Sequence, residues 1–143
     1  MKKIILSLAL LVSCNSFAQT APELVAEATE MAMANPNNTD IKTTLEKALD
    51  LQPTNEAALY QLAIYHINHT TDHYAMSPLT KLIDIAPTNP EYYWLRAKIN
   101  IRKNALKAEL LQAQKDLQRA KELGYADTDR LTKASGYIEQ FLN

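Results

Sequence analysis

The chain has 143 residues, of which 22% are charged and 47% hydrophobic, and its formal net charge is −1. This composition is typical of one globular domain. Only two glycines are present, which argues against a glycine-rich phosphate loop and against a fold of tight hairpins. There is no basic block, and this argues against nucleic acid as the main partner, because phosphate binding needs clustered Lys and Arg.

The first 18 residues have the pattern of a secretory signal peptide. Two lysines follow Met1, residues 4–12 are apolar apart from one serine, and residues 16–18 place small side chains at a cleavage site. This apolar run is too short to span a membrane. We therefore expect residues 19–143 to be exported as one domain without a transmembrane span, to the periplasm or the medium. Cleavage would leave 13 basic and 16 acidic residues.

Cys14 is the only cysteine, so no internal disulfide is expected. Residues 11–14 (Leu-Val-Ser-Cys) resemble a bacterial lipoprotein box, in which the cysteine is acylated. Cleavage after Ala18 would remove Cys14, whereas acylation would make it the mature N-terminus and anchor the domain to a membrane. Both alternatives stay open at this stage.

Seven stretches of the remaining chain repeat apolar residues at three- and four-residue steps, which is typical of amphipathic helices. No stretch alternates with the period of a strand. Their apolar faces include Leu51, Ile85 and Phe141 near helix ends. We expect an all-α domain, with helices over about 22–34, 39–51, 56–69, 73–86, 90–103, 105–123 and 128–142.

Pro78 lies inside the fourth stretch and allows two interpretations. It either kinks a helix that starts near His73 or takes the first position of a shorter helix capped by Ser77. We favour the kinked helix slightly.

A short phrase occurs twice in the chain, 34 residues apart. Residues 51–55 (Leu-Gln-Pro-Thr-Asn) are echoed by residues 85–89 (Ile-Ala-Pro-Thr-Asn), and the same shift places Ala63 on Ala97. A fixed period of about 20 to 50 residues indicates a stacked-repeat architecture.

Helix pairs with this period resemble the tetratricopeptide repeat (TPR). Setting Pro53 and Pro87 at repeat position 32 gives repeats over 22–55, 56–89 and about 90–127, followed by a capping helix at 128–142. Repeat two fits the pattern best, with Leu59, Leu62, Ala63, Ala75, Leu79 and Pro87 at positions 4, 7, 8, 20, 24 and 32. The resemblance implies an α-solenoid of about three antiparallel helix pairs plus the capping helix.

Three departures from the repeat pattern stand out. His66 takes a position where an aromatic residue is usual, and Arg96 takes one where leucine is expected. Repeat three matches in its second helix only after an insertion of four residues, which aligns Ala113, Leu117 and Ala120.

The resemblance also implies a concave groove lined by the first helix of each pair. Tyr60 and Trp94 are its expected anchors, because aromatic residues dominate binding energetics. Lys98 and Arg102, four residues apart on one helix face, would hold a peptide carboxylate. The full set is Glu23, Ala26, Glu30, Met33 and Ala34 in repeat one, Ala57, Tyr60, Ile64, Ile67 and Asn68 in repeat two, and Glu91, Trp94, Lys98, Ile101 and Arg102 in repeat three.

A plainer interpretation is that the two aromatic anchors only pack against neighbouring helices and the charges are solvated. Some TPR proteins hold the C-terminal carboxylate of chaperone tails with a basic and asparagine clamp. Here only Lys98 and Arg102 resemble that clamp, and Glu30 stands in the groove of repeat one in place of a base. We do not expect chaperone binding.

His66, His69 and His73 gather near Asp72 and are weak candidates for a zinc site, which needs three or four converging ligands. The stronger alternative places His66 in the core and the other two in an exposed turn. No catalytic motif is found, so we expect neither an enzyme nor a cofactor. The sequence predicts a non-catalytic adaptor of the cell envelope that binds a protein or peptide; a self-associating structural protein, or a weak metal or small-ligand binder, is the alternative.

Overall fold

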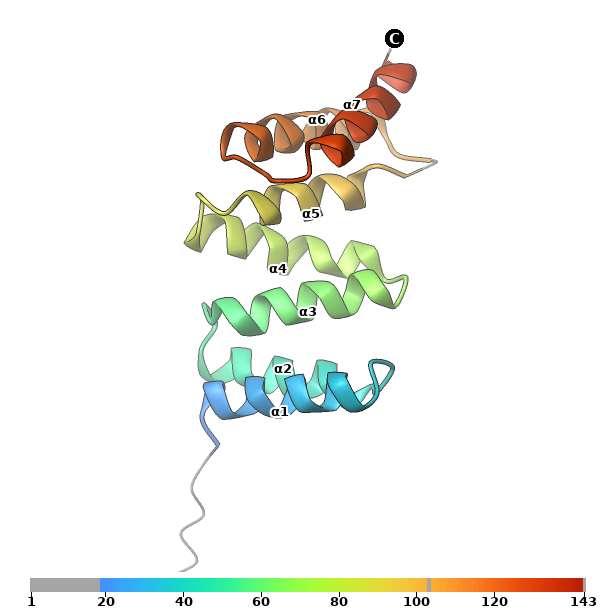
Figure 1. Cartoon of the computed structure of the whole chain (residues 1–143). Helices are drawn as coiled ribbons and strands as arrows, with labels where there is room; N and C mark the ends of the chain where they lie inside the picture. The colour runs from blue at the N-terminus through green and yellow to red at the C-terminus, as the bar shows by residue number, and fades with distance from the viewer. Residues whose placement is uncertain (1–18, 103, 143) are drawn as a thin grey trace, which may run out of the picture.

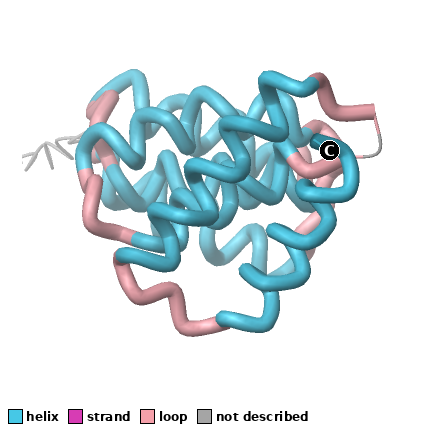
Figure 2. Tube along the Cα trace, turned by 90° about the horizontal axis from the view of Figure 1, so that it is seen from above, coloured by secondary structure: helices cyan, strands magenta, loops and turns pink. Residues whose placement is uncertain are grey.

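The computed structural model describes residues 19–102 and 104–142, and these residues form seven α-helices and no strand. The predicted all-α class is confirmed, and Figure 2 shows helices joined only by loops. The predicted signal peptide and Cys14 lie outside the described residues. The helices are α1 (Ala21–Ala34), α2 (Asp40–Leu51), α3 (Glu56–Asn68), α4 (Asp72–Ile85), α5 (Pro90–Asn100), α6 (Lys107–Glu122) and α7 (Thr128–Leu142).

The helices stack in chain order, with α1 and α7 at opposite ends (Figure 1). Each helix packs chiefly against the one before it and the one after it. Short connections make consecutive helices antiparallel, so α1/α2, α3/α4 and α5/α6 are three pairs and α7 closes the stack. This is the α-solenoid with a terminal helix that the repeat pattern predicts.

The repeated phrase marks the boundaries between pairs. Each copy begins with the last residue of a second helix and ends in an asparagine that caps the first helix of the next pair. The Asn55 side chain accepts a hydrogen bond from the backbone N–H of Ala58 at 3.0 Å, and that of Asn89 accepts one from Glu91 at 3.1 Å. Such caps satisfy N–H groups that a helix start leaves without partners.

Alanines allow the helices to approach closely. Ala28, Ala48, Ala63, Ala97 and Ala113 are all completely buried. α3 serves two core clusters: its Ala58 and Leu62 pack with α1 and α2, and its Leu59 and Ala63 pack with α4 and α5. A helix with two apolar faces is therefore held between neighbours.

Two expectations about the helices are corrected. α4 runs unbroken through Pro78, which is buried, so the shorter helix starting at that proline is wrong. Leu51, Ile85 and Phe141 are 59%, 39% and 55% exposed, although they continue apolar faces. Leu51 and Ile85 occupy the same repeat position, at the end of a second helix, where the chain turns away before the next pair can cover it.

No helix in residues 19–102 and 104–142 has the length and apolar content needed to cross a membrane.

Candidate functional site

A cleft of about 360 Å³ opens between α1 and α3, the first helices of the first two pairs. Met33 stands at its edge and is 79% exposed. Gln61 donates a hydrogen bond to Thr29 Oγ1 at 2.8 Å, which ties the two helices together. The cleft is predominantly apolar and is lined by Thr29, Ala32, Met33, Pro36, Ile41, Tyr60, Gln61, Ile64, Tyr65, Asn68 and His69.

Four predicted groove residues line this cleft: Met33, Tyr60, Ile64 and Asn68. We call the surface formed by the cleft and the adjoining side of α5, including Glu91 and Trp94, the groove face. Ile67 and Ile101 are half-buried and pack against the core, so they support the groove face from behind. The remaining predicted positions in α1 (Glu23, Ala26, Glu30 and Ala34) and Ala57 in α3 are exposed.

Both predicted aromatic anchors pack against other rings and stay partly exposed. Tyr60 lies with its ring centroid 6.0 Å from that of Tyr92, and Trp94 stacks on Tyr125 with centroids 5.4 Å apart. The Tyr92 hydroxyl donates to Glu56 at 2.5 Å, and burial together with this hydrogen bond raises the pKa of Tyr92. The anchors are thus held in fixed orientations while part of each ring still faces solvent.

Two tyrosines of this region have raised pKa values. Burial raises the pKa of Tyr60, and the carboxylate of Glu91 raises it further. The pKa of Tyr125 is likewise raised, first by burial and then by Glu91. A negative charge has this effect because it opposes the formation of a second negative charge.

The expected placement of Lys98 and Arg102 on one helical face is wrong. α5 ends at Asn100, so Ile101 and Arg102 lie beyond the helix and the four-residue spacing from Lys98 no longer places both cations on one helical face. The Arg102 guanidinium instead pairs with Glu109 in the first turn of α6. Lys98 is exposed and is the remaining cation of the predicted groove set.

The three histidines differ in burial. His66 is buried, and its Nδ1 lies 3.0 Å from Thr71 Oγ1. His69 was expected in an exposed turn, but it is half-buried, donates from Nδ1 to the Tyr65 carbonyl at 2.7 Å and stacks on the Tyr65 ring. His73 is exposed.

His69 is half-buried because it is the C-cap residue of α3 and its ring folds back over Tyr65. His66 and His69 both line a second cleft of about 530 Å³, which α2, α3 and the start of α4 form, and His73 is not part of that lining. Among residues 19–102 and 104–142, no group of three or more His, Cys, Asp or Glu side chains is placed to hold a metal ion.

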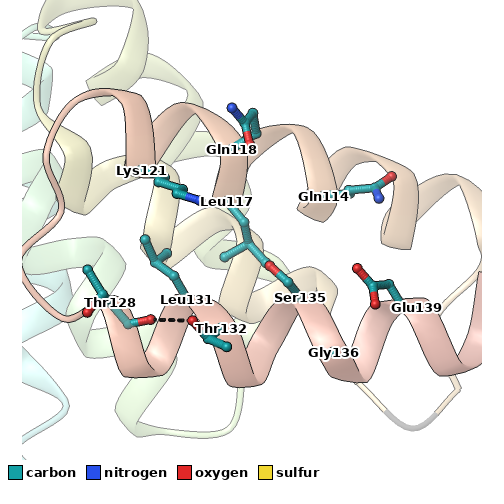
Figure 3. Close-up of a pocket in the computed structure, with 10 residues that line it drawn as sticks. All are labelled: Gln114, Leu117, Gln118, Lys121, Thr128, Leu131, Thr132, Ser135, Gly136 and Glu139. Carbon is teal, nitrogen blue, oxygen red and sulfur yellow. Dashed lines mark hydrogen bonds between the residues drawn. The ribbon is translucent and has the colours of Figure 1, made fainter.

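The sequence did not predict a third cleft, which lies between α6 and α7 (Figure 3). It encloses about 470 Å³, and amide, hydroxyl and charged side chains line it together with Leu117 and Leu131. Thr132 donates to the Thr128 carbonyl at 2.9 Å, so this hydroxyl is already used within α7. The only signal of this cleft in the sequence was the set of polar residues on the side of α7 that faces α6. A capping helix is polar wherever it meets solvent, so these residues did not by themselves indicate a cleft.

Solved structures with the same arrangement of helices are TPR domains. The first TPR of Spaghetti (RPAP3), bound to the HSP90 peptide SRMEEVD, matches 87% of this chain and 94% of its own with a TM-score of 0.72 and 18% identity. The Yersinia enterocolitica type III secretion chaperone SycD, in complex with a peptide of the translocator YopD, matches 90% of this chain and 100% of its own with a TM-score of 0.73 and 15% identity. A second SycD structure matches 85% and 87% at a TM-score of 0.60 and 16% identity.

No family model and no curated protein matches the chain by sequence. The structural likeness shows that the chain has the TPR fold. This fold agrees with the helix pairs that the 34-residue period predicts.

Proposed function

We propose that this protein is a non-catalytic adaptor that binds a protein or peptide segment on its groove face. The observation that carries the proposal is the apolar cleft between α1 and α3, because it places Tyr60, Ile64 and the exposed Met33 around one hollow. Apolar and aromatic pockets of this size take up one or two large side chains of a partner. The two TPR domains solved with bound peptides support this use of the fold.

The proposed place of action is the cell envelope. Its support is the N-terminal sequence, where a charged start, an apolar run and small residues before Gln19 form an export signal. Either cleavage after Ala18 or acylation of Cys14 delivers the repeats outside the cytoplasm. Mass spectrometry of the mature N-terminus distinguishes them, because acylation retains Cys14 and adds lipid mass, whereas cleavage after Ala18 begins the chain at Gln19.

A matched pair of substitutions tests the groove assignment. Met33 and Leu51 are both exposed apolar residues in the last turn of a helix, but only Met33 lines the cleft. A lysine at either site is favourable to the helix dipole, so neither variant should lose its fold. Tagged protein should capture the same envelope partner as the parent when it carries Leu51→Lys and should lose that partner when it carries Met33→Lys.

Capture that persists in Met33→Lys would show that the partner binds elsewhere. Self-association is the competing function, since the same apolar cleft would serve a second copy of the chain. Light scattering at micromolar concentration separates the two: an obligate oligomer that Met33→Lys converts to a monomer would replace the adaptor proposal.

A further inference from the structure

The cleft formed by α2, α3 and the start of α4, here called the histidine cleft, has a buried histidine in its lining. It encloses about 530 Å³. Its lining includes His66 and Leu62, which are 7% and 8% exposed, so these two residues form its floor. Lys42 and Glu46 also line it, and their side chains are 45% and 49% exposed, so they stand at its mouth.

Among residues 19–102 and 104–142, one ring nitrogen of His66 has no hydrogen-bond partner. The Thr71 hydroxyl donates to the His66 carbonyl at 3.2 Å, so its oxygen accepts from His66 Nδ1–H at 3.0 Å. Nε2 of the neutral ring is therefore an acceptor. In this part of the chain, His69 Nε2 is the one fully covered side-chain nitrogen or oxygen without a partner. His66 Nε2 therefore still reaches the surface, through the cleft that its ring lines.

Aromatic rings form the walls of the histidine cleft. The Tyr65 ring meets the His66 ring edge-on with centroids 5.8 Å apart, and it stacks on the His69 ring at 4.1 Å. The Tyr74 ring lies 5.5 Å from the His66 ring and is 59% exposed. All four rings line the cleft. Because aromatic rings attract further rings in stacked and edge-to-face arrangements, these walls suit a flat aromatic ligand.

The charges at the mouth disfavour a cationic ligand. Aromatic cages commonly bind ammonium groups. Here Lys42 repels such a group, and the carboxylate of Glu46 is already paired with Lys42 at 3.4 Å. Burial, followed by Lys42, lowers the pKa of His66, so its ring is neutral at pH 7.5 and can accept a hydrogen bond. A neutral ring with one hydrogen-bond donor matches these groups.

We propose that the histidine cleft binds a small neutral aromatic ring that carries an N–H or O–H group, as in an indole or a phenol. The ring packs among Tyr65, His69 and Tyr74, and its donor reaches His66 Nε2. The volume of the cleft lies in the range of small-molecule pockets. The ring arrives either as a free compound or as the tryptophan or tyrosine side chain of a partner. This site is independent of the groove assignment.

Indole and 1-methylindole test the proposal, because they differ only in the methyl group that replaces the N–H. Binding to the purified protein at pH 7.5 is followed by the amide NMR signals, and His66 Nε2 is observed after nitrogen-15 labelling of histidine. Indole should bind with a Kd of about 1 mM or below and about fivefold tighter than 1-methylindole. Indole should also move the Nε2 signal toward that of a hydrogen-bonded nitrogen, whereas 1-methylindole should not.

Matched variants locate the binding site. Tyr74→Ala removes one wall and should weaken indole binding about fivefold. Phe141→Ala removes an aromatic ring of similar exposure in α7, outside the cleft, and should leave binding unchanged. His66→Phe keeps a ring at the floor and removes Nε2, so indole and 1-methylindole should bind this variant equally. The Nε2 signal of the parent tests the same hydrogen bond without any substitution.

Three results would each overturn the proposal: no binding of indole up to about 5 mM, equal affinities of the parent for the two indoles, or equal losses in Tyr74→Ala and Phe141→Ala. Met33→Lys should bind indole as the parent does, and a loss there would place the compound in the groove cleft instead. N-acetyltryptophanamide separates the two sources. Binding as tight as that of indole supports a tryptophan side chain, and binding about tenfold weaker supports a free compound.

Discussion

Repeats two and three have the same order of helices but different contacts inside each pair. At repeat positions 7 and 23, repeat two has Leu62 and Pro78, which are both buried. With the four-residue insertion, repeat three has Arg96 and Asp116 at these positions. Arg96 holds Asp116 through two hydrogen bonds of 2.8 and 2.9 Å. The same two repeat positions therefore hold buried apolar residues in repeat two and an ion pair in repeat three.

The connections inside the two pairs differ as well. α3 and α4 are joined by residues 69–71, whereas α5 and α6 are joined by the longer segment 101–106. This connection is three residues longer, and shifted ends of α5 and α6 account for the rest of the insertion. The ion pair between Arg102 and Glu109 spans the longer turn. Neighbouring pairs contact each other along their helices. The turn inside a pair therefore tolerates extra residues that would disturb a helix.

The largest effect is expected from a core leucine shared by both repeats. Leu79 in α4 and Leu117 in α6 occupy the same repeat position and are 0% and 2% exposed. Leu79→Ala and Leu117→Ala should each lower the free energy of unfolding by about 3–4 kcal/mol in urea denaturation, because each leaves a cavity. Leu51→Ala, at an exposed site, should cost less than about 0.5 kcal/mol. A loss below about 1 kcal/mol at either buried site would contradict a shared role of this repeat position in the core.

The ion pair of repeat three gives the next effect. The Asp116 side chain is 3% exposed and that of Arg96 is 15% exposed. Asp116→Ala should cost about 3 kcal/mol, because it leaves a largely buried guanidinium without its partner. The double change Arg96→Leu/Asp116→Leu makes both positions apolar, as in repeat two, and should recover the loss to within about 1 kcal/mol of the parent. If the double variant is no more stable than Asp116→Ala in urea denaturation, the two repeats are not interchangeable at this position.

The repeat frame could be predicted from the sequence because its signals are local. The Pro-Thr-Asn phrase ends one helix and caps the next within five residues, and the alanines recur at a fixed period. The lining of the cleft by Tyr60 and Ile64 followed from the same frame.

The pairing of charges could not be predicted in this way, because each partner comes from a different helix. Lys98 and Arg102 suggested a clamp only while α5 was assumed to continue to residue 103, and nothing in the spacing showed that Glu109 would take Arg102. A sequence signal did exist for the other pair: Arg96 stands at a core position, and Asp116 lies on the apolar side of α6 next to Leu117. A buried base and a buried acid on adjacent helices indicate an ion pair.

The two glycines lie beside and inside the closing helix. Replacing either by alanine should change the free energy of unfolding by about 1 kcal/mol. Gly124 has a φ of +82°, whereas a methyl group at Gly136, inside α7, would meet nothing within 4 Å. Gly136→Ala should raise the free energy of unfolding by about 1 kcal/mol, since alanine favours the helix. Gly124→Ala should lower it by about 1 kcal/mol, because the left-handed conformation strains a side chain. Urea denaturation checks both, and a loss on Gly136→Ala would contradict the open space seen beside it.

His66 supplies the smallest expected effect, a dependence of stability on pH. It takes the aromatic position of repeat two, and burial, followed by Lys42, lowers its pKa below the ordinary value of 6.5, although Glu46 opposes this. The Thr71 hydroxyl donates to the His66 carbonyl at 3.2 Å, so its oxygen accepts from His66 Nδ1–H, and the neutral ring carries its proton on Nδ1.

On acidification, His66 takes up its proton at a higher pH in the unfolded chain than in the folded chain. Its contribution to the free energy of unfolding is therefore complete above about pH 6.5, and it is lost as the pH falls through the lowered pKa of the folded chain. His66→Phe restores the usual aromatic residue and removes this contribution. The difference in Tm between pH 7.5 and pH 5.5 should therefore be smaller in His66→Phe than in the parent, and His73→Gln, at an exposed site, should behave as the parent does. If the parent and His66→Phe lose the same Tm on acidification, the pH dependence comes from other groups and the buried ring serves only to pack repeat two.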